Sequence, residues 1–244
     1  IALLIRMLPR HVVSQWRQVT GHTQKLKATL RQFADFAVFS TIAQQAQLVV
    51  MLGLQMGIAA FFSGHLAGQY ILAVSILTLP VSLIALSTAP VVYHHFIETE
   101  KTNPARLVRY FLTMTGLYLL VGIVVFAPIF VAGEALFSFA FGAIWAHAGK
   151  IAAMLSIAYV ATFALTGVQS ILMVTRRLKL QFMLELGTCI PALLAAIFCF
   201  KTMDFDRAIF YLSLIWLLRN VVLLCASLLA AVQHPHQPNA EAHG

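Results

Sequence analysis

Residues 64–96, a long stretch without charged side chains, constrain the fold more than any other segment. It contains no Asp, Glu, Lys or Arg, and a transmembrane helix needs only about 20 apolar residues to cross roughly 30 Å of hydrocarbon. Pro80 and Pro90 each remove a backbone donor inside the run, and neighbouring Ser and Thr hydroxyls can satisfy the freed carbonyl groups. We therefore expect a bent transmembrane helix, for which a packing role and a gating role both stay open.

The composition excludes a soluble globular protein. Hydrophobic residues make up 61% of the 244 residues and charged residues 10%, whereas soluble domains average about 45–50% and 25%. The net charge of +8 does not indicate nucleic-acid binding, because most Lys and Arg residues lie between apolar segments. The three cysteines, Cys189, Cys199 and Cys225, fall in apolar segments without CxxC spacing, so neither a disulfide nor a metal site is predicted.

The apolar segments together predict an all-α polytopic membrane protein. The six predicted spans are residues 36–62, 64–96, 112–132, 151–175, 180–200 and 208–232, which form one transmembrane unit over 36–232. Residues 133–150 are aromatic and interrupted by Gly, so we expect an interfacial segment there. Residues 1–8 resemble the end of a partial leading helix, 9–35 a basic cytoplasmic loop and 233–244 a disordered tail. Since the chain opens on Ile1, we expect a longer protein.

The Lys and Arg residues of the polar segments are distributed unequally between the two predicted sides. Cytoplasmic segments of membrane proteins carry an excess of Lys and Arg. The side with more of them is therefore expected to be cytoplasmic. That side holds Arg10, Arg17, Lys25, Lys27, Arg31, Lys101, Arg106, Arg109, Arg176, Arg177 and Lys179, and the other side holds Lys150, Lys201 and Arg207.

Two ionisable side chains, Glu185 and Arg219, fall well inside predicted spans. At 1.5 Å per residue, Arg219 lies about 16 Å into the last span and Glu185 about 8 Å from the cytoplasmic end of its own. A central Arg costs at least about 2.5–3.5 kcal/mol to insert, so it should face protein or water. The axial gap of about 12 Å argues against a direct bridge between them. Arg219 either binds an anion or caps backbone carbonyls, and Asn220 suits both roles.

A glutamine-rich face in the first span is a second candidate site. Gln44, Gln47 and Gln55 share a helix face, from which Gln45 is offset. Such a face suits either interhelical hydrogen bonds or a cavity for a polar substrate. The pair His94–His95 suits either an interfacial position or proton transfer. No nucleophile with an adjacent base, paired carboxylates or glycine-rich phosphate loop is recognisable, so neither an enzyme nor a cofactor is predicted.

Two stretches carry a family resemblance, AGQYILAVSILTLPVSLIALSTAPVVYHHF from residue 67 and GEALFSFAFGAIWAHAGKIAAML from residue 133. They resemble the second half of bacterial polysaccharide flippases of the multidrug/oligosaccharidyl-lipid/polysaccharide exporter superfamily. The resemblance covers about residues 28–186, and the last two spans are similar only in hydropathy. The matching positions are Gly68, Tyr70, Leu77, Pro80, Leu83 and Ile84 in the first stretch, and Phe141, Gly142, Trp145, Ala148 and Gly149 in the second.

The resemblance implies one lobe of a two-lobed transporter that flips polyprenyl-linked polysaccharide repeat units, as in lipopolysaccharide or exopolysaccharide synthesis, across the bacterial inner membrane. The lipid-linked glycan, membrane lipids and a missing N-terminal lobe would be its partners. The polar head of the substrate would ride in a largely cationic cavity, with Arg219, Gln44, Gln47, Gln55 and Asn220 as substrate-binding residues and Glu185 as an ion-coupling residue. A membrane enzyme of the same pathway, such as a polymerase or ligase, and a multidrug exporter lobe stay open as alternatives.

Overall fold

The structure, a computed structural model, describes residues 45, 47–102, 106–175 and 178–233. They all belong to one of the two units into which the chain divides, Ala43–Gly244. The predicted leading helix (1–8), the basic loop (9–35), most of the tail and Gln44 lie outside the described residues.

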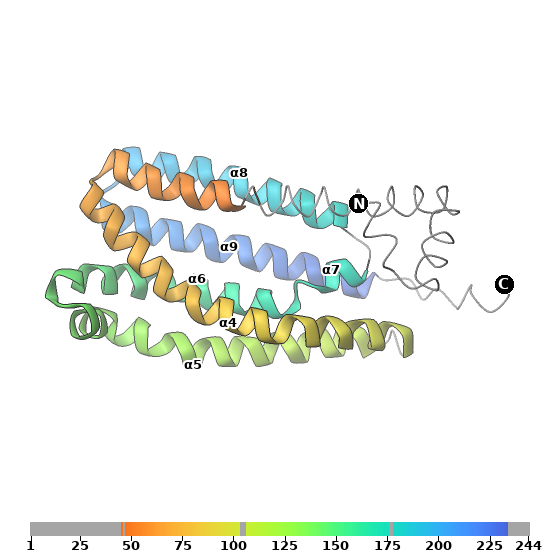
Figure 1. Cartoon of the computed structure of the whole chain (residues 1–244). Helices are drawn as coiled ribbons and strands as arrows, with labels where there is room; N and C mark the ends of the chain where they lie inside the picture. The colour runs from red at the N-terminus through yellow and green to blue at the C-terminus, as the bar shows by residue number, and fades with distance from the viewer. Residues whose placement is uncertain (1–44, 46, 103–105, 176–177, 234–244) are drawn as a thin grey trace, which may run out of the picture. The chain divides into compact units, whose positions relative to one another are not determined.

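All secondary structure in the described ranges is helical, which confirms the all-α prediction for that part of the chain (Figure 1). Five segments are long and apolar enough to cross a membrane, which indicates a multi-pass membrane protein. The first predicted span is described only in part, as the shorter apolar helix Gln47–Phe61. The helices that follow it are α4 (Gly64–Thr102), α5 (Leu107–Phe141), α6 (Ala146–Val168), α7 (Ile171–Val174), α8 (Leu178–Thr202) and α9 (Phe205–Val232).

The helices extend beyond the apolar runs that predicted them. The predicted spans 64–96 and 112–132 left a polar connection between them, but α4 continues into it up to Thr102 and α5 already starts at Leu107. With 39 residues, α4 is about 58 Å long, nearly twice the roughly 30 Å of hydrocarbon in a bilayer. Hydropathy marks the part of a helix that lipid can cover, and the helix itself ends further on, in polar sequence.

α4 runs as one helix across Pro80 and Pro90, and it changes direction along its length (Figure 1). The carbonyl groups that these prolines leave without a donor belong to Ile76 and Leu86. Contrary to expectation, the described hydroxyls of α4 do not bond to these two carbonyls. Ser75, Thr78, Ser82, Ser87 and Thr88 donate to the carbonyls of Ile71, Val74, Thr78, Leu83 and Ile84.

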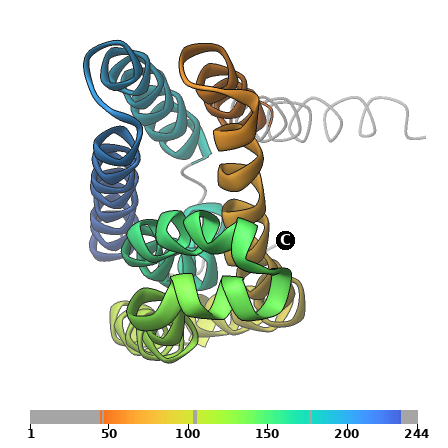
Figure 2. The same cartoon turned by 90° about the vertical axis from the view of Figure 1, so that its left-hand side faces the viewer.

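α5 continues past Ala132, where we expected the span to end. The backbone leaves helical geometry at Ala132 (φ −129°, ψ 26°), resumes it, and stops at Phe141. Gly142 has φ +98°, which glycine adopts without steric cost, and a 3-10 turn, η2 (Ala143–Trp145), leads into α6. The segment expected to be interfacial is therefore the tip of the α5–α6 hairpin, which Figure 2 shows from its end.

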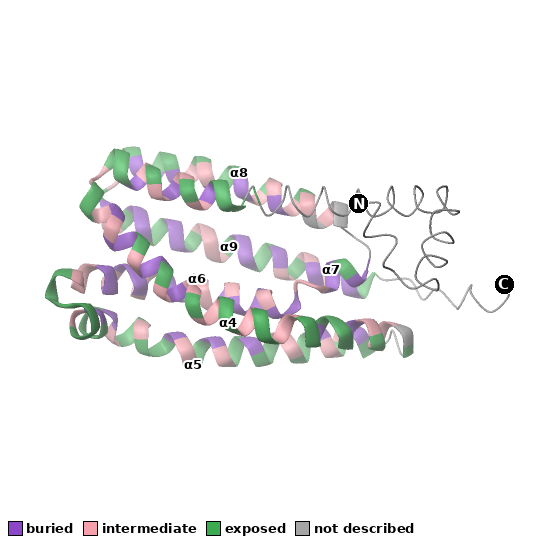
Figure 3. Ribbon diagram, in the orientation of Figure 1, coloured by how far each residue is buried: buried purple, intermediate pink, exposed green. Residues whose placement is uncertain are grey.

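α6 packs against three other long helices. It contacts α5 along its length and also packs against α4 and α9. In the most apolar stretch of the segment Ala143–Val174, which contains α6, 61% of the residues are buried, against 17% in α4, whose exposed stretches are green in Figure 3. A Cβ added to Gly133 would lie 2.5 Å from the carbonyl oxygen of Gly149. The backbones of α5 and α6 therefore touch, as small residues permit in membrane helices.

α8 and α9 form an antiparallel hairpin beside this group. α9 packs against both α6 and α8, and so joins the two parts of the bundle. The helix Gln47–Phe61 packs against α8, where Gly57 faces the ring of Phe200 and Gly53 faces Leu193. Large apolar side chains remain exposed on the outer faces of all these helices, which suits lipid contact rather than water.

Candidate functional site

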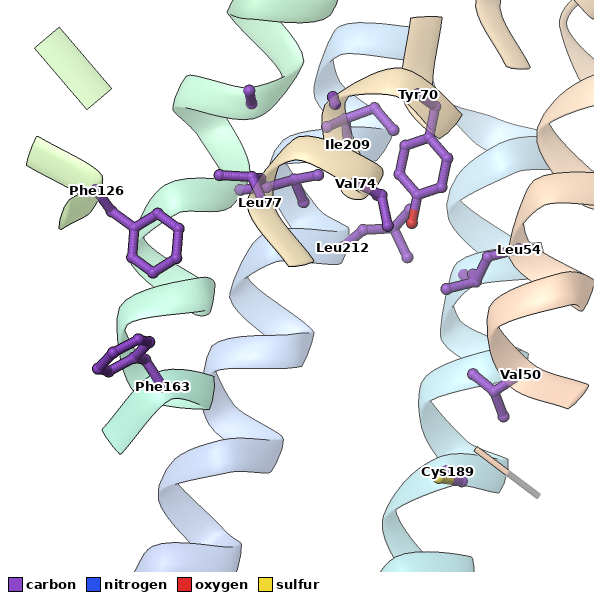
Figure 4. Close-up of a cluster of buried hydrophobic side chains, with 14 of the residues drawn as sticks. Val50, Leu54, Tyr70, Val74, Leu77, Phe126, Phe163, Cys189, Ile209 and Leu212 are labelled. Carbon is purple, nitrogen blue, oxygen red and sulfur yellow. The ribbon is translucent and has the colours of Figure 1, made fainter. Parts of the chain in front are cut away.

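A cavity of about 250 Å³ lies among the helix Gln47–Phe61, α4, α6, α8 and α9. Figure 4 shows Val50 and Leu54 on one side of this space, with Tyr70, Val74 and Leu212 on the other. The wall is mostly apolar, as in most small-molecule sites, but the volume is below their usual range of about 300–1,000 Å³. The cavity is therefore large enough for only a part of a large amphiphilic substrate.

One wall of the cavity follows from the spacing of residues on the first described helix. Gln47, Val50, Met51 and Leu54 line the cavity, and their spacing of three, four and seven residues places them on one helix face. Gln55 is half-buried and lies outside the described cavity wall. The structure thus places one member of the predicted glutamine face in the cavity.

The polar groups on the described wall are neutral. The Tyr159 hydroxyl lies 3.1 Å from Thr78 Oγ1, and Tyr70 is buried with no hydrogen-bond partner for its hydroxyl among the described residues. Tyr70 therefore offers an open hydrogen-bonding position to a ligand or to water. The described wall carries no charged side chain, in contrast to the cationic cavity that the family resemblance implies.

Arg219 of α9 and Glu185 of α8 form an ion pair close to this wall, which corrects the prediction that they lie too far apart to meet. Each is only 5% exposed. Gln169 Nε2 donates to Glu185 Oε1 at 3.1 Å. The Arg219 guanidinium carbon lies 4.9 Å from the centre of the Trp216 ring, and Trp216 also lines the cavity. One aromatic side chain thus contacts both the ion pair and the cavity.

The prediction was wrong because it measured depth from opposite ends of the two helices. α8 and α9 are joined by a short turn between Thr202 and Phe205. Counted from this turn, Glu185 lies about 25 Å along α8 and Arg219 about 21 Å along α9. α9 also begins before residue 208, its expected start, so Arg219 lies deeper than expected. Two long side chains readily bridge the remaining offset of about 4 Å.

The pairing limits what Arg219 can bind in this arrangement. Its Nη2 group is bonded to Glu185 and lies 3.7 Å from Cys189 Sγ, whereas its buried Nε has no partner among the described residues. Neither Arg219 nor Glu185 is part of the described cavity wall. An anion in the cavity would therefore reach the guanidinium only after Glu185 or Trp216 moved.

Asn220, the other predicted binding residue on α9, connects α9 to α6. Its side chain is buried and donates to Thr162 Oγ1 at 2.8 Å and to the Ala158 carbonyl at 3.4 Å. Thr162 and Ala158 both line the cavity. Asn220 thus binds two residues of the cavity wall without lining the cavity itself.

The sequence analysis missed Gln69, which fixes the start of α6. Gln69 is buried on α4; its Nε2 donates to the Ile144 carbonyl at 2.8 Å, and its Oε1 accepts from the Ala148 backbone N–H at 2.9 Å. The first N–H groups of a helix have no partner inside the helix, so Gln69 acts as a cap from a neighbouring helix. The sequence did contain a signal for this role. Gln69 lies in a stretch without charged residues, and a buried amide needs a hydrogen-bond partner.

The histidines and carboxylates of the described part do not gather into a metal site, because no group of three or more metal-ligating residues occurs there. His94 and His95 are exposed near the end of α4, with their Nδ1 atoms 3.6 Å and 3.5 Å from Glu98 Oε2. At the other end of the bundle, Lys150 of α6 and Asp206 of α9 form an ion pair, and His147 Nε2 lies 3.5 Å from Asp206.

The residues of the second resemblance stretch have structural roles at the α5–α6 hairpin. Gly142 makes the turn, Ala148 is capped by Gln69, and Gly149 is the site of backbone contact. No protein-family model matches the chain, and no curated protein or solved structure matches it.

Proposed function

We propose that the chain is a lobe of a transporter that flips polyprenyl-linked polysaccharide repeat units across a bacterial inner membrane. The sequence resemblance suggests this function, and the five long apolar helices are compatible with it. The observation that carries the proposal is a cavity inside the helical bundle, lined by hydroxyl groups, an amide and aromatic rings on an otherwise apolar wall. Neutral hydrogen-bonding groups and aromatic faces suit sugar hydroxyls and sugar rings.

The small cavity is consistent with a site shared between two lobes. A volume of about 250 Å³ is too small for a glycan repeat unit, so a second lobe would supply the rest of the enclosure. The lobe described here then contributes one wall, with Gln47 at its edge and Tyr70 and Tyr159 deeper inside.

In this proposal the Glu185–Arg219 pair couples ion binding to substrate binding. A coupling cation bound at Glu185 would take the place of Arg219 at the carboxylate, and an unpaired buried charge costs about 3–5 kcal/mol. A substrate pyrophosphate would then stabilise Arg219 in place of the carboxylate, through charge-assisted hydrogen bonds. Trp216, which contacts both the guanidinium and the cavity, is the side chain that must move for this exchange.

The test is export of surface glycan by the full-length protein in a strain that lacks its own flippase. Ala192 lines the cavity, so Ala192→Phe should reduce export while the protein remains abundant in the membrane. Leu194→Phe, at an exposed position on the same helix, should export normally. Normal export by Ala192→Phe would exclude the cavity from the transport path. If the Ala192→Phe variant still exports glycan, but as shorter chains than the unchanged protein produces, the polymerase alternative would be favoured.

A further inference from the structure

We propose that a groove between α4 and α5 binds an anionic glycerophospholipid. The groove has a volume of about 590 Å³ and is bounded by the second half of α4, the first half of α5 and Phe163 of α6. It shares no wall residue with the cavity described above. The inference therefore does not rest on the proposed transport function.

The interior of the groove suits a hydrocarbon chain. Ile, Val, Leu, Met and Phe side chains make up most of its wall. Four hydroxyl groups also line it. Three of them already donate inside the protein, Ser87 to the Leu83 carbonyl, Thr88 to the Ile84 carbonyl and Tyr118 to Thr88 Oγ1, and the fourth, Tyr110, lies at the mouth. A polar ligand would find those donors occupied, whereas an acyl chain loses nothing by covering satisfied hydroxyls.

The groove lies at the end of α4 that is expected to be cytoplasmic. Ile84, its first residue on α4, is about 30 Å along the helix from Gly64, and His95 is about 47 Å along it. If the outer end of α4 starts at the opposite membrane surface, this stretch covers the inner leaflet and its headgroup layer. Val91 and Leu117 are half exposed at the groove, so a lipid can enter from the bilayer.

Two arginines of α5, Arg106 and Arg109, lie close in sequence to the mouth of the groove. Tyr110 and His95 form the mouth, with ring centres 6.1 Å apart. Arg106 precedes Tyr110 by four residues and so continues the same face of α5, one turn beyond the groove. Arg106 and Arg109 are exposed and have no ion partner among the described residues. His95 lies 3.5 Å from Glu98, which leaves the arginines as the phosphate ligands.

An apolar groove with Arg106 one turn beyond its mouth matches a lipid that has an acyl chain and an anionic headgroup. Arg binds phosphate through several directed N–H groups, and each basic residue near an anionic membrane surface adds a modest increment to lipid affinity. A zwitterionic phosphatidylcholine offers the same chain but no net negative charge. The groove should therefore distinguish lipids by headgroup.

The test is native mass spectrometry of the full-length protein in detergent, with phosphatidylglycerol or phosphatidylcholine added at equal concentrations. Phosphatidylglycerol should be retained preferentially. Arg106→Gln should weaken its retention about five-fold. The matched control is Arg207→Gln, which removes an exposed arginine at the start of α9 and should leave retention unchanged.

A second pair of variants tests the groove itself. Leu117→Trp places a bulky ring in the groove and should lower retention of phosphatidylglycerol, whereas Leu120→Trp, exposed on the same helix outside the groove wall, should not. Equal retention of the two lipids, or full retention by Arg106→Gln, would overturn the proposal. So would displacement of phosphatidylglycerol by an equal concentration of polyprenyl phosphate, which would assign the groove to an isoprenoid.

Discussion

Arg219 and Glu185 form an ion pair between two antiparallel helices, and both side chains are almost completely buried. Either charge alone would be expensive in the membrane interior, which is why unpaired ionisable residues are rare there. Gln169 adds a hydrogen bond to the carboxylate from the junction between α6 and α7. The pair therefore ties α8 to α9 at a depth where lipid offers no alternative partner.

We predict strong coupling between these two residues. Arg219→Gln leaves the Glu185 carboxylate buried without its partner and should lower the free energy of unfolding by about 3–5 kcal/mol. Glu185→Gln should have a similar cost, while the double variant should lose much less than the sum. Unfolding of the four proteins in detergent micelles measures the coupling. Additive losses would mean that the pair does not form in solution.

A second prediction concerns the backbone contact between α5 and α6. Gly149→Ala would push a Cβ into the carbonyl group of Gly133. Overpacking at a rigid contact costs about 1–3 kcal/mol, so the melting temperature should fall. Gly116→Ala is the matched control on α5, because nothing lies within 4 Å of its added Cβ. That change should be neutral or slightly stabilising, since Gly is a poor helix former.

The sequence predicted the helices better than the contacts between them. The five long apolar segments were visible in the sequence because an apolar run of sufficient length can only be buried or covered by lipid. Helix ends were less accurate, since α4 continues through the polar residues up to Thr102. The kink at Ala132 falls where hydropathy placed the end of a span. The sequence therefore located the break in helical geometry, but it did not show that the helix continues beyond the break.

The candidate site was less predictable, because it depends on the register between helices. Whether Arg219 meets Glu185 is set by the length of the turn after α8, which hydropathy does not fix. Tyr70 belonged to the first resemblance stretch and Trp216 to no motif, but nothing in the sequence marked either of them as a cavity residue. Gln47 was recognised because an amide in an apolar span needs a partner, and the same reasoning applied to Gln69 would have revealed its cap.

A third prediction tests the cap that Gln69 provides. Gln69→Leu retains similar bulk but leaves the Ala148 N–H and the Ile144 carbonyl without their partner. Losing a buried partner costs about 1–3 kcal/mol, so thermal stability should decrease. Gln55→Leu, at a half-buried position on the helix Gln47–Phe61, is the control and should have a smaller effect. Equal effects of the two variants would argue against a cap.

The last prediction concerns orientation in the membrane. The chain turns before α4, between α5 and α6, and between α8 and α9, and these turns lie at the same end of the bundle (Figure 1). The opposite side of the predicted topology holds eleven of the fourteen Lys and Arg residues in polar segments, so that side should be cytoplasmic. After the three native cysteines are replaced by Ala, a membrane-impermeant maleimide should label Gly64→Cys and Asp204→Cys in intact cells. Thr102→Cys should react only after permeabilisation, and the reverse pattern would invert the topology and place the lipid groove in the outer leaflet.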